Sequence, residues 1–223
     1  MNPVSSDLLL AIDRYVEELF APTDSLLANN LKAAEAAGLP SINVSAAEGK
    51  LLYLLAKVAG ARRVLEIGTL GGYSTTWLAR ALPAGGTVIS LEVDPRHAAV
   101  ARKSVEGAAP GVSVEVRLGD AVESLRAMIA AREAPFDVVF IDADKGRYVQ
   151  YLDLSLQLCR SGSIVLGDNL IRHGLVLDAS TTDESARGAR AYNEAIASHP
   201  RLESIVLPLV RDKVDGLSIS RVR

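Results

Sequence analysis

Short apolar runs rich in Val and Ile alternate with helical stretches through the middle of this chain. Strands are expected at Val64–Ile67, Val88–Glu92, Val112–Arg117, Val138–Ile141 and Ile164–Gly167. Helices are expected between them, near Ser74–Leu82, Pro95–Ala108, Val122–Ala131 and Tyr148–Cys159. This alternation favours right-handed β-α-β crossovers and a parallel sheet with helices on both faces.

The C-terminal part departs from this alternation. After a helix over Glu184–Ser198, two strands at Ser204–Leu209 and Gly216–Ser220 lie so close in sequence that they predict an antiparallel hairpin at one edge of the sheet. The expected fold is therefore α/β, with a Rossmann-like, doubly wound, seven-stranded and mostly parallel sheet that ends in this hairpin.

Three helices are expected before the first strand. Leu8, Ile12, Tyr15 and Leu19 mark one face of the first helix, and the second stops near Gly38. The third opens with the capping-box pattern of residues 45–48, Ser-Ala-Ala-Glu, and runs to about residue 59. These extra N-terminal helices suggest a lid or a dimer surface.

The length and charge of the chain narrow its class. Its 223 residues suit one domain, with residues 1–60 as the helical lid or dimer segment and 61–223 as the Rossmann-like core. The net charge is −3 and no Lys/Arg run appears, so nucleic acid is a poor default partner. With one Cys, Cys159, no intrachain disulfide is possible; its apolar, helical surroundings indicate packing.

No feature of the sequence indicates a membrane or an export route. The first residues lack the basic region of a signal peptide, and no apolar run approaches the length of a membrane span. We expect a cytoplasmic protein without a membrane partner.

Polar side chains follow two of the predicted strands. Asp142, Asp144 and Lys145 come after Val138–Ile141, while Asp168 and Asn169 follow the next strand. Since ligand sites in open α/β sheets lie at the carboxyl ends of the strands, these groups should converge at one rim. Oxygen ligands from two carboxylates and an amide suit Mg²⁺, Mn²⁺ or Ca²⁺ rather than zinc, so the pattern predicts a hard-metal site with a lysine beside it.

A glycine-rich turn follows the first strand and predicts a ligand. Gly68 lets the backbone approach a ligand closely, and Ser74 lies where the next helix begins. Glu66 would repel a pyrophosphate but would suit an ammonium group. Glu92 ends the second strand, where a ribose-binding acid belongs, and Ala121 follows the third, where a small residue could flank adenine. S-adenosylmethionine fits this combination.

Several ordered motifs resemble the cation-dependent O-methyltransferases, the class I group that includes catechol and caffeoyl-CoA O-methyltransferases. The resemblance covers most of the chain, including LEIGTLGGYSTTWLA, LEVDP, FDVVFIDADKGRY, GDNLIRHG and DGLSIS. The bacterial small-molecule branch is the most similar. The resemblance implies a divalent-metal-dependent transfer of a methyl group from S-adenosylmethionine to a small acceptor, and a homodimer.

The resemblance also implies roles for individual residues. Asp142, Asp168 and Asn169 would bind the metal, and Lys145 would act with Asp142 in catalysis by helping to deprotonate the acceptor hydroxyl. The residues expected to hold S-adenosylmethionine are Val44, Glu66, Gly68, Thr69, Ser74, Glu92, Ala121, Asp142 and Asp144. Since three protein ligands leave room for two neighbouring substrate oxygens on the metal, the acceptor should be catechol-like.

The acceptor-binding loop is less well defined by sequence. Residues 171–183 are polar and long enough to cover an acceptor, and plant relatives tend to carry Trp where this chain has Arg172. Candidates for substrate contacts are Arg172, Asp178, Arg187 and Arg211. His173 is interpreted as an ordinary loop histidine, and Tyr73 and Trp77 as core or cofactor-wall residues.

Three other functions fit parts of the pattern. The first is O-methylation of a hydroxylated tRNA uridine, which the acidic net charge disfavours. The second is a nicotinamide-dependent oxidoreductase, which the missing G-x-G-x-x-G, Glu66 and the terminal hairpin disfavour. The third is a non-catalytic binding module, which the intact set of polar residues disfavours. The identity of the acceptor, the regiochemistry and the physiological metal stay open.

Overall fold

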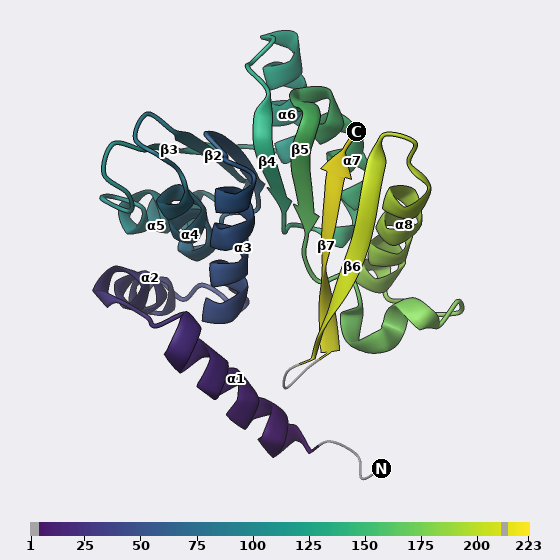
Figure 1. Cartoon of the computed structure of the whole chain (residues 1–223), viewed down its shortest axis with the longest axis horizontal. Coiled ribbons are helices and arrows are strands. Elements are labelled where there is room, and N and C mark those ends of the chain that lie inside the picture. Colours follow the sequence, from purple (N-terminus) through teal and green to yellow (C-terminus); the bar gives the residue numbers. More distant parts are fainter. Residues whose placement is uncertain (1–4, 211–213) are drawn as a thin grey trace.

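The computed structural model describes residues 5–210 and 214–223, which contain a seven-stranded sheet in the order β3-β2-β1-β4-β5-β7-β6 (Figure 1). The strands are β1 (Arg63–Ile67), β2 (Thr87–Glu92), β3 (Ser113–Leu118), β4 (Phe136–Ile141), β5 (Cys159–Gly167), β6 (Leu202–Val210) and β7 (Val214–Val222). Neighbours among β1–β5 are parallel, while β7 pairs antiparallel with both β5 and β6. The predicted fold is confirmed, including the antiparallel hairpin at one edge.

Helices cover both faces of the sheet. They are α1 (Ser6–Phe20), α2 (Ser25–Ala36), α3 (Ala46–Val58), α4 (Tyr73–Ala81), α5 (Pro95–Ser104), α6 (Ala121–Ala130), α7 (Tyr148–Ser155) and α8 (Glu184–Ser198), with short 3-10 turns η1 (Lys145–Arg147), η2 (Leu156–Leu158) and η3 (Arg172–Leu177).

Alternate residues of each strand face opposite hydrophobic cores. Val64 of β1 joins the core beneath α2–α5, and its neighbour Leu65 joins the core beneath α6–α8. Central strands buried on both faces appear in sequence as continuous apolar runs, which is why β1, β2 and β4 were recognisable.

Two predicted helices end earlier than expected. The predicted helix Pro95–Ala108 stops at Ser104, and the one ending at Cys159 stops as an α-helix at Ser155. Cys159 instead begins β5 and pairs with Phe136 of β4, so its assignment to a helix was wrong. The apolar sequence there suits a helix or a strand equally well, and pairing with a distant strand decides.

The N-terminal helices form as predicted, but they differ in packing. Ser45 and Glu48 form the capping box at the start of α3. Helix α1 extends away from the sheet (Figure 1) and buries none of its residues. No helix in the described residues is long and apolar enough to cross a membrane.

Candidate functional site

A cavity of about 530 Å³ lies at the carboxyl ends of the parallel strands. This volume falls within the range of small-molecule sites. Ten of the residues predicted to form the site line it: Val44, Gly68, Thr69, Ser74, Glu92, Ala121, Asp142, Asp144, Lys145 and Asn169. Two predicted residues, Glu66 and Asp168, do not line the cavity and lie behind it.

The turn after β1 depends on the close approach of two backbone segments. Gly68 has a φ of 98°, and a Cβ placed on it would lie 2.0 Å from the carbonyl oxygen of Asp142. Only glycine therefore lets the ends of β1 and β4 approach this closely. Gly72 precedes α4 with a φ of 84°, so Ser74 lies in the first turn of that helix.

Glu66 is buried behind this turn, with no exposed surface. Its carboxylate accepts hydrogen bonds from the hydroxyls of Ser74 at 2.6 Å, and of Thr75 and Ser90, both at 2.5 Å. Burial outweighs these hydrogen bonds and raises the pKa of Glu66 to about 7. From the sequence, Glu66 was expected to face the ammonium group of the ligand. In the structure, Ser74 lines the cavity and donates to the Glu66 carboxylate from the cavity side.

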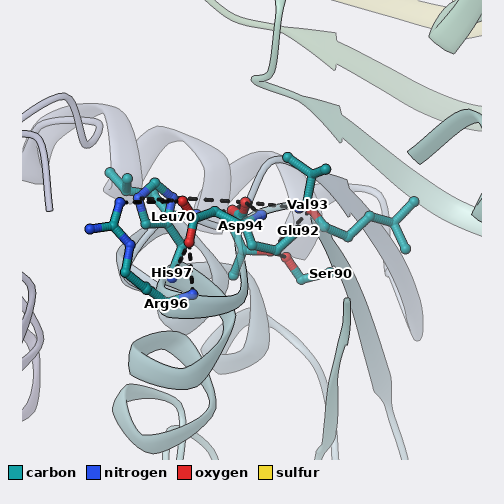
Figure 2. Close-up of polar contacts among 9 residues, drawn as sticks. Leu70, Ser90, Glu92, Val93, Asp94, Arg96 and His97 are labelled. Atoms are coloured by element: carbon teal, nitrogen blue, oxygen red, sulfur yellow. Dashed lines mark hydrogen bonds and ion pairs between the residues drawn. The ribbon is translucent and has the colours of Figure 1, made fainter. Parts of the chain in front are cut away.

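Glu92, at the end of β2, lies at the cavity wall and also organises the neighbouring backbone. Its carboxylate accepts hydrogen bonds from the backbone N–H groups of Thr69 and Leu70 on one oxygen and of Val93 and Asp94 on the other, at 2.8–3.2 Å. Figure 2 shows Leu70, Val93 and Asp94 around Glu92. This single side chain thus joins the turn after β1 to the turn after β2.

His97, near the start of α5, is a cavity residue that the sequence did not reveal. Its Nδ1 lies 3.8 Å from a carboxylate oxygen of Glu92, and its Nε2 lies 4.0 Å from one of Asp94 (Figure 2). A lone histidine in a helix carries no spacing signal. Its position in the first turn of the helix that follows the strand-end acid Glu92 was the available clue.

Lys145 is held by three acceptors. Its Nζ donates to Asp142 Oδ1 at 3.1 Å, to the carbonyl oxygen of Ala143 at 3.2 Å and to the Tyr148 hydroxyl at 2.7 Å. The buried Tyr148 hydroxyl in turn lies 3.0 Å from the Ile141 carbonyl oxygen, to which it can donate. Lys145 is 7% exposed and still lines the cavity, so its amine is held in a fixed orientation at the site.

Asp168 is 4% exposed, at the end of β5, and accepts a hydrogen bond from the backbone N–H of Asn169 at 2.7 Å. Burial raises its pKa well above the ordinary value, and the negative charges of Asp142 and Glu48 add to this effect. Two carboxylates near each other with one neighbouring lysine leave excess negative charge, which a cation would neutralise.

The donor set around Asp168 fits a hard divalent cation. Asp142, Asp168 and Asn169 supply oxygen atoms, which Mg²⁺ and Ca²⁺ prefer. Among the described residues, no group of three or more His, Cys, Asp and Glu side chains could hold a metal. The predicted set therefore reaches three ligands only with the Asn169 amide.

A charged cluster borders the cavity beside the predicted adenine position. Arg147 pairs with Asp120 at 2.7 Å and with Asp144 at 3.1 Å, and the Tyr151 hydroxyl donates to Asp144 at 2.5 Å. The cluster links the start of α6, next to Ala121, to the turn after β4. Asp144 therefore shapes the wall of the cavity as well as lining it.

The acceptor-loop candidates separate clearly. Arg172 lines the cavity, whereas His173, Asp178 and Arg187 do not, and Arg211 lies outside the described residues. Tyr73 lines the cavity, and Trp77 is a core residue. Cavity-lining residues that the sequence did not reveal on this side are Ile42, Asn43 and Ser185.

Comparison with known proteins identifies close relatives. A family model described as O-methyltransferase matches residues 17–221. The catechol O-methyltransferase of Niastella koreensis is 40% identical over 222 residues, which cover 99% of this chain and 100% of the relative.

Solved structures of relatives agree with the fold. The O-methyltransferase from Bacillus cereus in complex with SAH (S-adenosylhomocysteine) has a TM-score of 0.94 and 42% identity, and the match covers 98% of this chain and 100% of that one. The O-methyltransferase TomG from Streptomyces achromogenes, involved in tomaymycin synthesis and solved with SAM (S-adenosylmethionine), has a TM-score of 0.93 and 34% identity, with 99% of both chains covered.

Proposed function

Because this chain belongs to the O-methyltransferase family and is an S-adenosylmethionine-dependent enzyme of the catechol O-methyltransferase type, we propose that its acceptor is a small aromatic compound with vicinal oxygens. We propose further that the reaction depends on a divalent cation, Mg²⁺ or alternatively Mn²⁺ or Ca²⁺. The observation that carries this proposal is the grouping of Asp142, Asp168, Asn169 and Lys145 at the ends of two adjacent strands.

The family membership decides two of the alternatives. A nicotinamide-dependent oxidoreductase and a non-catalytic binding module, which the sequence already disfavoured, find no support, since the relatives are methyltransferases. O-methylation of tRNA finds no support among these relatives.

The proposed division of roles follows the strand order. Val44, Gly68, Thr69 and Ser74 would surround the methionine part of S-adenosylmethionine, with Glu66 supporting Ser74 from behind. Glu92 would receive the ribose, while Ala121 and Asp144 would border the adenine end. Asp142, Asp168 and Asn169 would bind the cation, whose positive charge would favour ionisation of an acceptor hydroxyl.

The chemical step itself is simple. The acceptor oxygen forms a bond to the methyl carbon as the carbon–sulfur bond breaks, and the electron pair of that bond stays on sulfur. Once its ammonium has lost a proton to solvent, Lys145 would take up the hydroxyl proton on Nζ, with Asp142 and Tyr148 orienting the amine. Beyond this, the protein contributes mainly the alignment of oxygen, carbon and sulfur.

Methyl transfer to caffeate with Mg²⁺, and then with excess EDTA, tests the proposal. We expect methylated caffeate that disappears when the chelator is added and returns with excess Mg²⁺. Turnover that is insensitive to EDTA would refute the role of the cation. Absence of product with caffeate and with other simple catechols, despite S-adenosylmethionine binding, would refute the acceptor class.

The assembly and location are part of the same proposal. We propose that residues 1–223 act as a single methyltransferase domain in the cytoplasm and that the enzyme is a homodimer. The apolar surface of α1 supports the dimer: Leu8, Leu10, Ile12, Tyr15, Leu19 and Phe20 are 41–63% exposed.

A further inference from the structure

The acceptor side of the cavity contains a guanidinium group to which the proposed reaction assigns no role. Arg172 lies three residues beyond Asn169, at the start of η3, and lines the same cavity as Lys145. The chemical group that Arg172 binds would narrow the class of acceptor, so this inference rests on the proposed function.

Arg172 differs from the other cations that line the cavity. Lys145 pairs with Asp142, and Arg147 pairs with both Asp120 and Asp144. Arg172 forms no ion pair with any residue in the described part of the chain. Its Nε is buried and has no hydrogen-bond acceptor there. A buried donor on a charged group is costly to leave unpaired, so an incoming anion would gain from meeting it.

The backbone around Arg172 is held in an unfavourable conformation. Arg172 and His173 have φ values of 50° and 55°, in the left-handed region that residues other than glycine rarely adopt. Asp215, at the start of β7, holds the segment by accepting hydrogen bonds from the backbone N–H groups of Ile171 and Arg172 at 3.1 and 3.2 Å. Strain of this kind persists when surrounding contacts enforce it, and it is concentrated at functional sites.

The strand order places Arg172 away from the cofactor end. The cavity extends from Ala121, after β3, across β2, β1 and β4 to Asn169 and Arg172, after β5. An acceptor whose vicinal oxygens lie near Asp142 and Asn169 would therefore have Arg172 within the same part of the cavity. Ser185, in the first turn of α8, adds a hydroxyl to this wall.

We propose that Arg172 forms an anion-binding subsite and that the preferred acceptor is a catechol carrying a carboxylate group on its ring or side chain. A guanidinium can donate two parallel hydrogen bonds to a carboxylate. It would hold the ring by the end opposite to the reacting hydroxyls.

Two nearly isosteric acceptors test this proposal: 3,4-dihydroxybenzoate and the uncharged 3,4-dihydroxybenzamide. We expect kcat/KM to favour the acid over the amide by roughly 10-fold or more, as charge-assisted hydrogen bonds allow. The variant Arg172→Gln should reduce this ratio to near 1, mainly by raising KM for the acid. Arg172→Lys should retain part of it.

Arg187→Gln is the matched control. Arg187 is an exposed arginine on α8 that lies outside the main cavity, and its loss removes the same charge from the same region of the molecule. The acid-to-amide ratio should stay at the wild-type value. A ratio that falls equally in both variants would indicate a general electrostatic effect and would overturn the proposal.

Calorimetry separates this proposal from the proposed reaction. Binding of the acid and the amide is measured in the presence of Mg²⁺ and S-adenosylhomocysteine. Tighter binding of the acid that depends on Arg172, without turnover of either compound, would support the subsite and refute the catechol reaction. A wild-type enzyme that binds and methylates both compounds equally, or binds neither, would overturn the subsite.

Discussion

Asp168 is the residue on which the proposed division between metal and cofactor binding depends most. It is buried beside Asp142 but does not line the cavity, so its loss should affect the cation more than S-adenosylmethionine. We expect Asp168→Ala to lower Mg²⁺-dependent turnover by roughly 100-fold. The calorimetric affinity for S-adenosylmethionine should stay within about 2-fold of wild type, as it should in the control Asp178→Ala. Equal losses of turnover and of cofactor affinity would contradict this separation.

The Tyr148 hydroxyl acts on the reaction through Lys145. It accepts a hydrogen bond from the amine at 2.7 Å and can donate to the Ile141 carbonyl, so it fixes the amine in position. We expect Tyr148→Phe to lower kcat by roughly 10-fold, the equivalent of one hydrogen bond to a charged group. The KM values for the acceptor and for S-adenosylmethionine should change little.

Tyr192→Phe is the control for this substitution. Tyr192 is buried and packs on Tyr148 with ring centroids 5.3 Å apart, but its hydroxyl has no hydrogen-bond partner within the described residues. Its loss should leave kcat unchanged and stability the same or higher. A similar fall of kcat in both variants would show that Tyr148 contributes packing only.

Glu66 makes stability depend on pH. Its pKa is about 7 in the folded protein, above the 4.5 of an unperturbed glutamate, because it is buried. The folded state therefore holds this proton more tightly. The resulting stabilisation is complete below pH 4.5 and is lost as the pH rises through 7. The free energy of unfolding would change by at most about 3 kcal/mol over this pH range.

Urea unfolding of wild type and Glu66→Gln at pH 5 and pH 8 measures this contribution. Glutamine keeps the shape and the acceptor oxygen but cannot ionise. We expect wild type to lose stability relative to the variant between the two pH values. Parallel pH dependences of the two proteins would mean that Glu66 titrates normally.

At the scale of elements, α8 positions the turn that carries Lys145. Gly188 of α8 lies so close to η1 that a Cβ on it would be 2.1 Å from the carbonyl oxygen of Lys145. Arg190, on the same helix, donates hydrogen bonds to the carbonyl oxygens of Val176 and Asp178 in and after η3. Helix α8 thus connects the acceptor loop to the catalytic lysine.

Gly188→Ala tests this connection. The added methyl group must push η1 and α8 apart, so we expect kcat to fall by roughly 10-fold or more, with a stability loss of about 1–3 kcal/mol. Gly146→Ala is the control, because a Cβ at Gly146, next to Lys145, meets nothing within 4 Å. Steady-state kinetics measure kcat of both variants. An equal fall of kcat in the two would indicate that any substitution near Lys145 is harmful.

Prediction from sequence succeeded where the pattern was local. The strands β1, β2 and β4 are buried on both faces, and Asp142 directly follows β4, while Asn169 comes just after the end of β5. It failed where a distant partner decides the structure. Cys159 is a strand residue because it pairs with Phe136. The sequence also could not show that the hydroxyls of Ser74, Thr75 and Ser90 donate to Glu66, whose role at the cofactor stays a prediction.

Some parts of the site have no sequence signal at all. Asn43 and Ser185 reach the cavity only because the N-terminal segment and α8 fold over it. The unpaired state of Arg172 depends on which charged groups surround it in space. A single sequence shows that an arginine is present, but its lack of an acidic partner among the described residues emerges only from the packed structure.

At the scale of the whole molecule, α1 is the least integrated part of the described chain. It buries none of its residues, although one face carries Leu8, Ile12, Tyr15 and Leu19. An isolated helix of 15 residues is marginal in water, and exposed apolar surface of this size is typical of an interface. The predicted homodimer would give this face a partner.

Replacement of Leu8, Ile12 and Leu19 by glutamate should therefore dissociate the dimer. These substitutions keep helix propensity but place charge at an apolar interface, where each unpaired charge opposes association.

Sedimentation at micromolar concentration should find a dimer for wild type and a monomer for the variant. Asp13→Glu on the same helix is a control for substitution alone, because it leaves the charge unchanged. A monomeric wild type would refute the dimer, and α1 would then have to contribute in another way. Methyl transfer that survives dissociation would show that each cavity is complete within one chain.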